Sequence, residues 1–378
     1  MDFSFSEEQE LIKKAAKAFA EAEISPIAAQ SDKDSDFPFS VIEAAHTNGF
    51  LNLAIPAEYG GIGLSAMDQL LVIEELAKAC SGITTSIIAN DLALLPIEIG
   101  GSEEQKKRIL GGVTAKPQLA SFCLSEPGAG SDVAGLSTTL TKVPGGYKLN
   151  GAKQWITNGG VAAHYTVFAT LDKSKKHKGI CCVAVPAGTK GISTGHHEDK
   201  LGQRASNTAS VIFEDVFVPD ADLIGKEGDG FQIAMKTLDN TRPITAIMAV
   251  GVAQAAINHA VRYAKERKQF GQALAEFQGL QFMLADMQTL TDASRLLCYQ
   301  AAYALDTKQN NPLASAMAKR LAADTAMQVT TDAVQIYGGY GYTKEYPVEK
   351  LMRDAKLFQI YEGTSQIQRV VIAREMLK

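Results

Sequence analysis

The run Leu119-Ala120-Ser121-Phe122-Cys123-Leu124-Ser125 (residues 119–125) marks the point at which the sequence changes from helical to strand periodicity. It has the length of a single β-strand, and Gly, Pro, Asn and Asp separate it from similar short runs further along the chain. These runs are Thr138–Val143, Tyr147–Leu149, Tyr165–Thr170, Gly179–Val185 and Ala209–Val218. Their spacing leaves no room for crossover helices, and no Gly-x-Gly-x-x-Gly fingerprint follows any of them. The sequence therefore predicts a small antiparallel barrel or sandwich and not a doubly wound nucleotide fold.

Helical spacing precedes and follows this predicted β unit. Ser6 and Gln9 have the pattern of a capping box at the start of the first helix. A linker is expected from Gly111-Gly112 to Lys116-Pro117, where the period changes. Further helices are predicted at 41–48, 66–79, 103–110, 231–268, 277–308 and 312–337. The predicted fold class is α+β multidomain, with an all-helical domain at residues 1–117, a β-barrel or sandwich at 118–226 and a helical bundle at 227–378.

Composition and charge argue against several classes of protein. The 378 residues carry a formal net charge of -5 and no long basic run, so nucleic-acid or anionic-membrane binding has little support. The five cysteines show neither metal-ligand spacing nor a disulfide framework, which fits a reducing cytosol and predicts no metal site. The N-terminal residues are acidic, whereas a secretory signal would begin with basic residues and an apolar block. No apolar run approaches the roughly 20 residues of a membrane span, and we expect a cytoplasmic protein.

A second informative stretch lies near the C-terminus, Ile360-Tyr361-Glu362-Gly363-Thr364-Ser365-Gln366. It places the Glu362 carboxyl between an aromatic residue and a glycine. Desolvation in such a turn would raise the pKa of the carboxyl and make Glu362 a stronger base. The alternative is that Glu362 is a first-turn acid of the final helix, with Thr364 as the N-cap. On chemistry alone the two interpretations are equally supported.

Asp91 stands inside the otherwise apolar run 83–99, where a charge is expensive to bury unless it is paired or used. One interpretation places Asp91 on the solvated side of a helix or makes it the cap of a local turn. The other makes it a second acid or base within a substrate pocket. The sequence leaves both open.

Five motifs together resemble the acyl-CoA dehydrogenase family, and they follow one another in the order and spacing of that family. They are Ser125-Glu126-Pro127-Gly128-Ala129-Gly130-Ser131-Asp132, Trp155-Ile156-Thr157-Asn158-Gly159, Arg267-Lys268-Gln269-Phe270-Gly271, Gln335-Ile336-Tyr337-Gly338-Gly339 and Tyr361-Glu362-Gly363-Thr364. The resemblance spans almost the whole chain. It implies an FAD enzyme in which Glu362 removes the α-proton of an acyl-CoA thioester.

The resemblance also implies where the cofactor and the substrate bind. One wall of the flavin site would come from the β unit, with Trp155 over the ring, although Trp155 alone could equally be a buried core aromatic. A neighbouring subunit would complete the FAD site. The implied FAD residues are Phe122, Leu124, Ser125, Gly130, Ser131, Trp155, Ile156, Thr157, Thr364 and Gln366, and, from the neighbour, Arg267, Gln269, Phe270, Gln278, Gln335, Gly338 and Gly339. The implied substrate residues are Ser131, Asp239, Thr241, Arg242 and Gly363.

The expected reaction is α,β-desaturation of a short- or medium-chain acyl-CoA, because Thr241 stands where long-chain members of the family carry an alternative Glu base. A first alternative is a dehydrogenase of an alicyclic thioester, cyclohexene- or cyclohexane-carboxyl-CoA, that uses Asp91 as a base. A second is a non-catalytic or oxygen-using flavoprotein of the same fold. By resemblance, the partners would be an electron-transferring flavoprotein and further copies of the chain in a homotetramer, a dimer of dimers.

Overall fold

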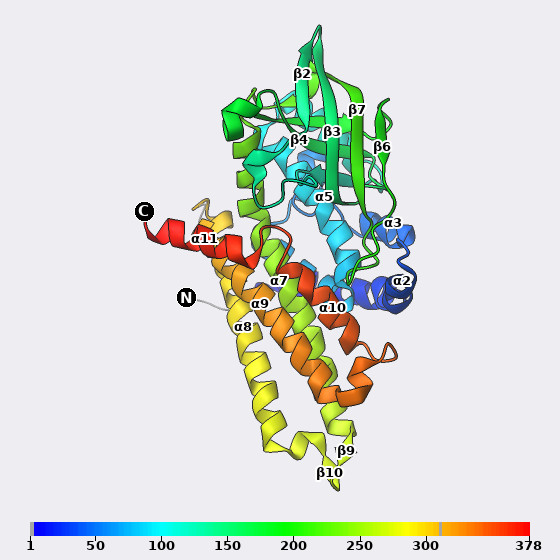
Figure 1. Ribbon diagram of the computed structural model, residues 1–378. Helices are drawn as coiled ribbons and strands as arrows, with labels where there is room; N and C mark the ends of the chain where they lie inside the picture. The colour runs from blue at the N-terminus through cyan, green and yellow to red at the C-terminus, as the bar shows by residue number, and fades with distance from the viewer. Residues whose placement is uncertain (1–3, 310–311) are drawn as a thin grey trace.

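The computed structural model describes residues 4–309 and 312–378. Helices at both ends of the chain flank a central sheet (Figure 1), which confirms the predicted fold class. Residues 1–3, at the start of the first predicted domain, lie outside the described part. The helices are α1 Glu7–Phe19, α2 Ala28–Asp34, α3 Phe39–Thr47, α4 Ala66–Ala79, α5 Ser81–Gly100, α6 Glu103–Thr114, α7 Gly230–Glu266, α8 Gln278–Asp306, α9 Pro312–Tyr337, α10 Val348–Phe358 and α11 Ser365–Met376. The strands are β1 Ala120–Cys123, β2 Thr139–Val143, β3 Gly146–Thr157, β4 His164–Thr170, β5 Ile180–Pro186, β6 Ile192–Thr194, β7 Thr208–Pro219, β8 Leu223–Ile224, β9 Lys268–Gln269 and β10 Gln272–Ala273.

In the N-terminal part α1, α4 and α6 begin where the sequence predicts helices, whereas α2 was not predicted. Ser6 caps α1, and its capping box with Gln9 is complete. The expected linker at Gly111 is wrong, because α6 continues through both glycines to Thr114. Glycine costs only about 1 kcal/mol in a helix interior. Burial of Ile109, Leu110 and Val113 against the core outweighs that cost.

The central sheet is mostly antiparallel, as predicted, and has the strand order β6-β7-β3-β2-β4-β5-β8. The exceptions are the parallel pairing of β1 with β4 and a short parallel contact between β2 and β4. All residues of β4 are buried, because both faces of the strand are covered: Phe168 packs in a core cluster with helix residues, and Tyr165, Val167 and Ala169 pack in a second cluster formed by other strands. β3 is far longer than predicted and extends to Thr157, so that it carries the first three residues of the Trp155 motif, while Asn158 and Gly159 lie in the turn that follows. The short strands β6 and β8 escaped prediction.

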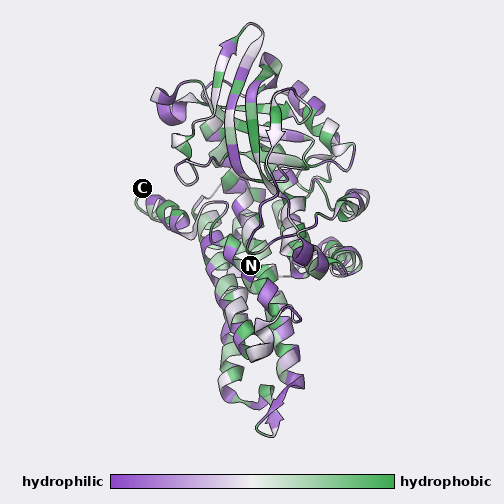
Figure 2. Ribbon diagram, turned by 45° about the vertical axis from the view of Figure 1, so that its right-hand side comes forward, coloured by the Kyte–Doolittle hydropathy of each residue, from purple (hydrophilic) through white to green (hydrophobic). Residues whose placement is uncertain are grey.

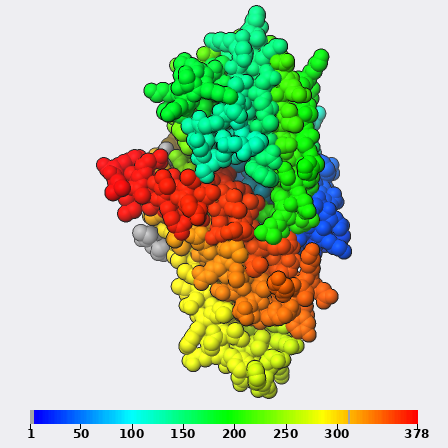
Figure 3. Space-filling model, in the orientation of Figure 1, coloured from blue at the N-terminus to red at the C-terminus, as the bar shows by residue number. Residues whose placement is uncertain are grey.

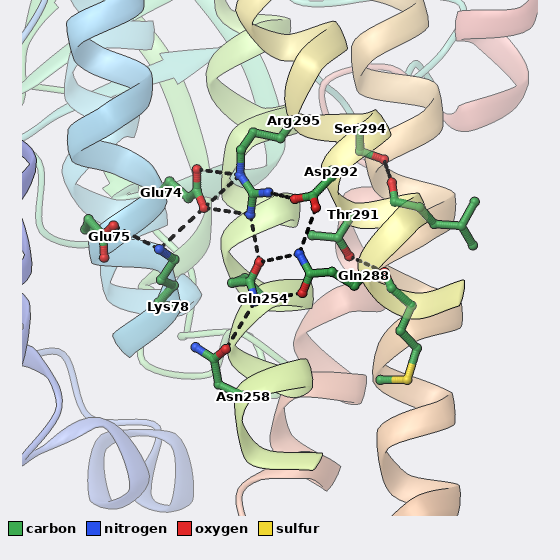
Figure 4. A network of polar contacts seen from close by, with 12 residues as sticks. Glu74, Glu75, Lys78, Gln254, Asn258, Gln288, Thr291, Asp292, Ser294 and Arg295 are labelled. Carbon is green, nitrogen blue, oxygen red and sulfur yellow. Dashed lines mark hydrogen bonds and ion pairs between the residues drawn. The ribbon is translucent and has the colours of Figure 1, made fainter. Parts of the chain in front are cut away.

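The C-terminal bundle is built on α7, which packs against α4, α8, α9 and α10. Figure 2 shows hydrophilic and hydrophobic residues interspersed along its helices, as amphipathic packing requires. A polar network crosses three of these helices (Figure 4). In it, Arg295 of α8 forms an ion pair with Glu74 of α4 at 3.0 Å and donates to Gln254 of α7 at 2.9 Å. The network therefore ties the N-terminal helices to the bundle.

The helices α5 and α7 occupy the centre of the protein. Among the described residues, these two helices are by length and composition apolar enough to cross a membrane, which corrects the expectation that no stretch approaches that length. However, 67% and 72% of their most apolar windows are buried inside the protein. Burial of that extent is typical of core helices.

The last helix, α11, lies where the sheet and the bundle meet (Figures 1 and 3). It packs against α9. The turn between α10 and α11, residues 359–364, is therefore held at this junction. Glu362 lies in that turn.

Candidate active site

Glu362 lies outside both helices that flank it. Its φ of 55° and the 87° of Gly363 are both left-handed. Thr364 is the N-cap of α11, since its Oγ1 accepts the Ile367 N–H at 3.1 Å. Because Glu362 precedes the cap by two residues, it is not a first-turn acid. The backbone of the turn instead directs the carboxyl toward the interior.

The Glu362 carboxyl lines a cavity of about 270 Å³. Helices α4, α5, α7 and α8, the end of β3 and residues 361–362 form its walls. Among the predicted site residues, the cavity brings together Glu362, Asp91, Thr157 and Thr241. Thr241 donates through Oγ1 to Glu362 Oε2 at 3.2 Å. Two carboxyls from distant parts of the sequence thus face one space.

Burial raises the pKa of Glu362, while Arg242, the Thr241 hydroxyl and Lys319 offset part of this rise. Arg242 is 5% exposed and forms an ion pair with Asp239. Its Nε is buried, and no acceptor for it was found in the described part of the chain. A carboxyl with a raised pKa beside a cavity is suited to accept a proton from a bound substrate.

Asp91 has contacts that bear on both interpretations of the sequence. It lines the cavity, and its carboxyl also accepts the backbone N–H groups of Leu53 at 3.2 Å and Ala54 at 3.0 Å. Burial raises the pKa of Asp91 to about 7, although the two hydrogen bonds act in the opposite direction. Placement on the solvated side of the helix was therefore the wrong interpretation. Asp91 caps a local turn from within the cavity wall.

The predicted flavin wall forms one face of the sheet domain. Trp155 is 62% exposed, so its interpretation as a core aromatic is wrong. Ile156 points the other way into the core, and Thr157 returns to the cavity side. Phe122 packs on Phe168 at 5.0 Å between ring centroids. The remaining predicted residues of this wall follow β1, with Leu124 buried, Ser125 half-buried, and Gly130 and Ser131 exposed.

A second set of predicted cofactor residues lies at the opposite end of the bundle, around β9 and β10 (Figure 1). The Arg267 guanidinium lies 5.3 Å from the Tyr340 ring centroid, and Phe270 is 95% exposed. The other members, all exposed, are Gln269, Gln278, Gln335, Gly338 and Gly339. One chain does not bring this set to Glu362. Thr364 and the exposed Gln366, by contrast, begin α11 beside the Glu362 turn.

Sequence reasoning missed the residues that support the site. Lys319 of α9 and Gln368 of α11 both donate to the Gly363 carbonyl, at 2.6 and 3.0 Å. Lys153 is fully buried and forms a 2.7 Å ion pair with Glu126 behind the flavin wall. Although burial opposes it, the Lys153 charge lowers the pKa of Glu126 to about 2. For Lys319, the only signal in the sequence is a lysine in an alanine-rich helix.

Comparison with known proteins agrees with this geometry. Models of the acyl-CoA dehydrogenase N-terminal, middle and C-terminal domains match residues 6–116, 121–216 and 228–377. The chain belongs to the acyl-CoA dehydrogenase family. It is 44% identical over 381 residues to the short-chain specific acyl-CoA dehydrogenase of Clostridium acetobutylicum, with all of both chains covered. Among solved structures it is similar to butyryl-CoA dehydrogenase of Megasphaera elsdenii, with TM-score 0.97, 41% identity and full coverage of both chains. A structure described as electron transferring flavoprotein of Acidaminococcus fermentans matches with TM-score 0.98, 44% identity and full coverage of both chains.

The residues present fit the FAD on which this family depends. The ring of Trp155 is open to solvent, and the Ser125, Ser131 and Thr157 hydroxyls are donors along the same wall. A Cβ built on Gly128 or Gly130 would meet nothing within 4 Å, so a ligand can approach the backbone there. A more distant relative, PigA, is 28% identical with TM-score 0.95 and is solved as an FAD complex. Within residues 4–309 and 312–378, no group of three or more His, Cys, Asp or Glu could hold a metal ion.

Proposed function

We propose that this acyl-CoA dehydrogenase desaturates a short- or medium-chain acyl-CoA between its α and β carbons, with Glu362 as the base. The observation that carries the proposal is the half-buried Glu362 carboxyl at the wall of the cavity, whose pKa desolvation raises. The α C–H bond breaks, its proton goes to Glu362, and its electron pair forms the new double bond. FAD, when bound, accepts the β-hydrogen as a hydride, which balances the electrons.

The backbone of the same turn supports the negative charge that develops on the thioester oxygen. Among the described residues no acceptor is found for the Glu362 N–H, so this group is free to donate to the thioester carbonyl. Donors aimed at a developing oxyanion are the largest single contribution in many enzymes. The other substrate contacts we propose are Ser131, Asp239, Thr241, Arg242 and Gly363.

Thr241 supports a short- or medium-chain substrate, because it stands where long-chain members of the family carry an alternative Glu base. Its hydroxyl hydrogen-bonds Glu362, and threonine cannot itself act as a strong base, so Glu362 is the base that the site offers at this position. The similarity to short-chain and butyryl-CoA dehydrogenases points the same way.

The test is anaerobic bleaching of the flavin by butyryl-, octanoyl- and cyclohexene-carboxyl-CoA. Rapid bleaching by a straight-chain ester supports the proposal, and the faster of the two straight chains defines the length class. Bleaching by the ring compound alone would contradict it.

A second candidate is an alicyclic thioester as the substrate. The observation in its favour is that Asp91 faces the same cavity as Glu362 and that burial raises its pKa to about 7. Against it, the Asp91 carboxyl already accepts two backbone N–H groups. An Asp91→Asn variant that loses only turnover of the ring compound would support this candidate, and unchanged turnover would remove it.

For the electron acceptor we propose an electron-transferring flavoprotein, supported by the similarity to the Acidaminococcus structure described by that name. Reoxidation of the reduced enzyme by such a protein, and slow reoxidation by oxygen, would distinguish this dehydrogenase from an oxidase.

We further propose a cytoplasmic homotetramer in which the Arg267 end of the bundle completes the FAD site of a neighbour. A monomer that retains tightly bound FAD would contradict this arrangement.

A further inference from the structure

The backbone of the Glu362 turn has an unfavourable conformation that neighbouring side chains maintain. Left-handed φ angles at consecutive residues, one of them not a glycine, persist only where the surroundings enforce them. Gln368 donates through Nε2 to the carbonyls of Glu362 at 3.1 Å and Gly363 at 3.0 Å. The Ser365 N–H donates back to the Gln359 carbonyl at 3.0 Å. These bonds fix the ends of the turn from its own segment.

Lys319 holds the turn from a different helix. It lies on α9, is 0% exposed, and donates through Nζ to the Gly363 carbonyl at 2.6 Å. It does not belong to the cavity wall, so it does not face the space that a substrate would occupy. Holding a carbonyl does not require a charge, and burying an ammonium is costly unless an opposite charge compensates it.

The Glu362 carboxylate acts on Lys319 through space, since the direct contact of Lys319 with the turn is to the neighbouring Gly363 carbonyl and no ion pair joins the two charges among the described residues. Burial lowers the pKa of Lys319 to about 7, whereas Glu362 acts to raise it. The same interaction opposes the effect of burial on the pKa of Glu362. Other charged groups surround Lys319 and Glu362. On α7, Arg242 is paired with Asp239, and Asp324 of α9 accepts a hydrogen bond from Arg369 of α11. Asp91 and Glu98 face the cavity from α5. Arg242 and Asp324 each have an ion-pair partner, Asp239 and Arg369, although Arg242 also acts to lower the pKa of Glu362 and Asp324 acts to raise that of Lys319. Lys319 is the cation in this group that is hydrogen-bonded to the Glu362 turn itself.

We propose that Lys319 is the positioning residue of Glu362: its ammonium fixes the left-handed turn through the Gly363 carbonyl and stabilises the ionised carboxyl. The catalytic consequence rests on the proposed function, whereas the effect on the ionisation of Glu362 does not. When Glu362 is charged, the buried pair is neutral overall. The carboxyl can then stay ionised, and able to accept a proton, at a pH at which burial alone would protonate it.

The direct test measures protonation of Glu362 in the FAD-loaded enzyme without substrate. Infrared difference spectra recorded against pH, with the band of the Glu362 carboxyl identified by its absence in Glu362→Gln, give the midpoint of its titration. Lys319→Met keeps the aliphatic length and removes the charge and the hydrogen bond. Lys319→Gln removes the charge and keeps a shorter N–H donor. Both should raise the midpoint by about one pH unit, the lower end of the effect of a close opposite charge.

Kinetics of flavin reduction separate the two parts of the role. At pH 6 both variants should reduce flavin with butyryl-CoA at least about tenfold more slowly, the change that a one-unit shift produces. At pH 9 Lys319→Gln should recover to near the wild-type rate, whereas Lys319→Met, which lacks the donor to Gly363, should remain slow. Substrate affinity should be similar in all three proteins, because Lys319 lies behind the turn.

Arg295→Met is the matched control, because it removes another largely buried cation, from the network of Figure 4. It should lower stability and leave the Glu362 midpoint unchanged. An unchanged midpoint in both Lys319 variants would overturn the proposal. If the wild-type enzyme is not reduced by any acyl-CoA, the proposed function fails, and the infrared midpoint still decides the role of Lys319.

Discussion

Replacement of Gly363 by alanine tests whether the Glu362 turn needs its observed conformation. At φ 87° an alanine sits in the left-handed region, which costs about 1–2 kcal/mol. Its Cβ would lie 2.7 Å from Gln368 Nε2, closer than real Cβ contacts allow. Gln368 must then move and lose its bonds to two carbonyls, each worth about 0.5–1.5 kcal/mol net. The sum is roughly 2–5 kcal/mol of lost stability.

The effect on activity follows from the same geometry. Relief of the strain would turn the Glu362 carboxyl away from the cavity, and a displacement near 1 Å costs on the order of 10²-fold in rate. Urea unfolding followed by circular dichroism gives the stability, and anaerobic stopped-flow reduction of the flavin gives the rate. Gly112→Ala is the matched control, since a Cβ there meets nothing within 4 Å inside α6. The control should be neutral or more stable by up to about 1 kcal/mol. A Gly363→Ala enzyme with wild-type stability and rate would show that the turn does not need its left-handed conformation.

Three further predictions follow from buried or remote groups. Lys153→Met leaves the Glu126 carboxylate buried without its partner. The variant should therefore lose about 3–5 kcal/mol of stability in urea unfolding and retain FAD poorly. FAD retention as in the wild type would contradict the role of this ion pair behind the flavin wall. Because the pKa of Asp91 is raised in the folded state, that state binds more protons than the unfolded chain between about pH 4 and 7, and stability falls as the pH rises through this range. The urea midpoint should therefore fall less between pH 5 and 8 in Asp91→Asn than in the wild type, and equal slopes would count against the assignment. Arg267→Ala should weaken FAD binding in equilibrium dialysis while leaving the fold of the monomer intact by circular dichroism; unchanged affinity would remove Arg267 from the cofactor site.

Most helices could be predicted from the sequence because their signals are local. The capping box at Ser6 sets a boundary that the structure keeps. The expected linker at Gly111-Gly112 was wrong because a local rule about glycine was applied where tertiary packing is stronger. The length of β3 was underestimated for the same kind of reason, since pairing with β7 extends it beyond its own strand-forming run.

The site was only partly predictable, because much of it depends on contacts distant in sequence. The position of Glu362 was found from its own neighbours, but the groups that hold it, Lys319 and Thr241, lie on two other helices. Asp91 was identified as unusual, yet its partners at Leu53 and Ala54 lie 38 and 37 residues away. No periodicity or spacing rule connects such positions. They come together only when α5, α7 and α9 pack.

Flavin reduction by butyryl-CoA in Glu362→Gln is the decisive measurement for the role of Glu362 as the base. Glutamine preserves the shape of the side chain and cannot accept the α-proton. With FAD bound and the Kd for butyryl-CoA near that of the wild type, we expect the rate to fall by at least about 10²–10⁴-fold, the usual contribution of a general base. A variant that binds FAD and bleaches at the wild-type rate would contradict the assignment of Glu362 as the base.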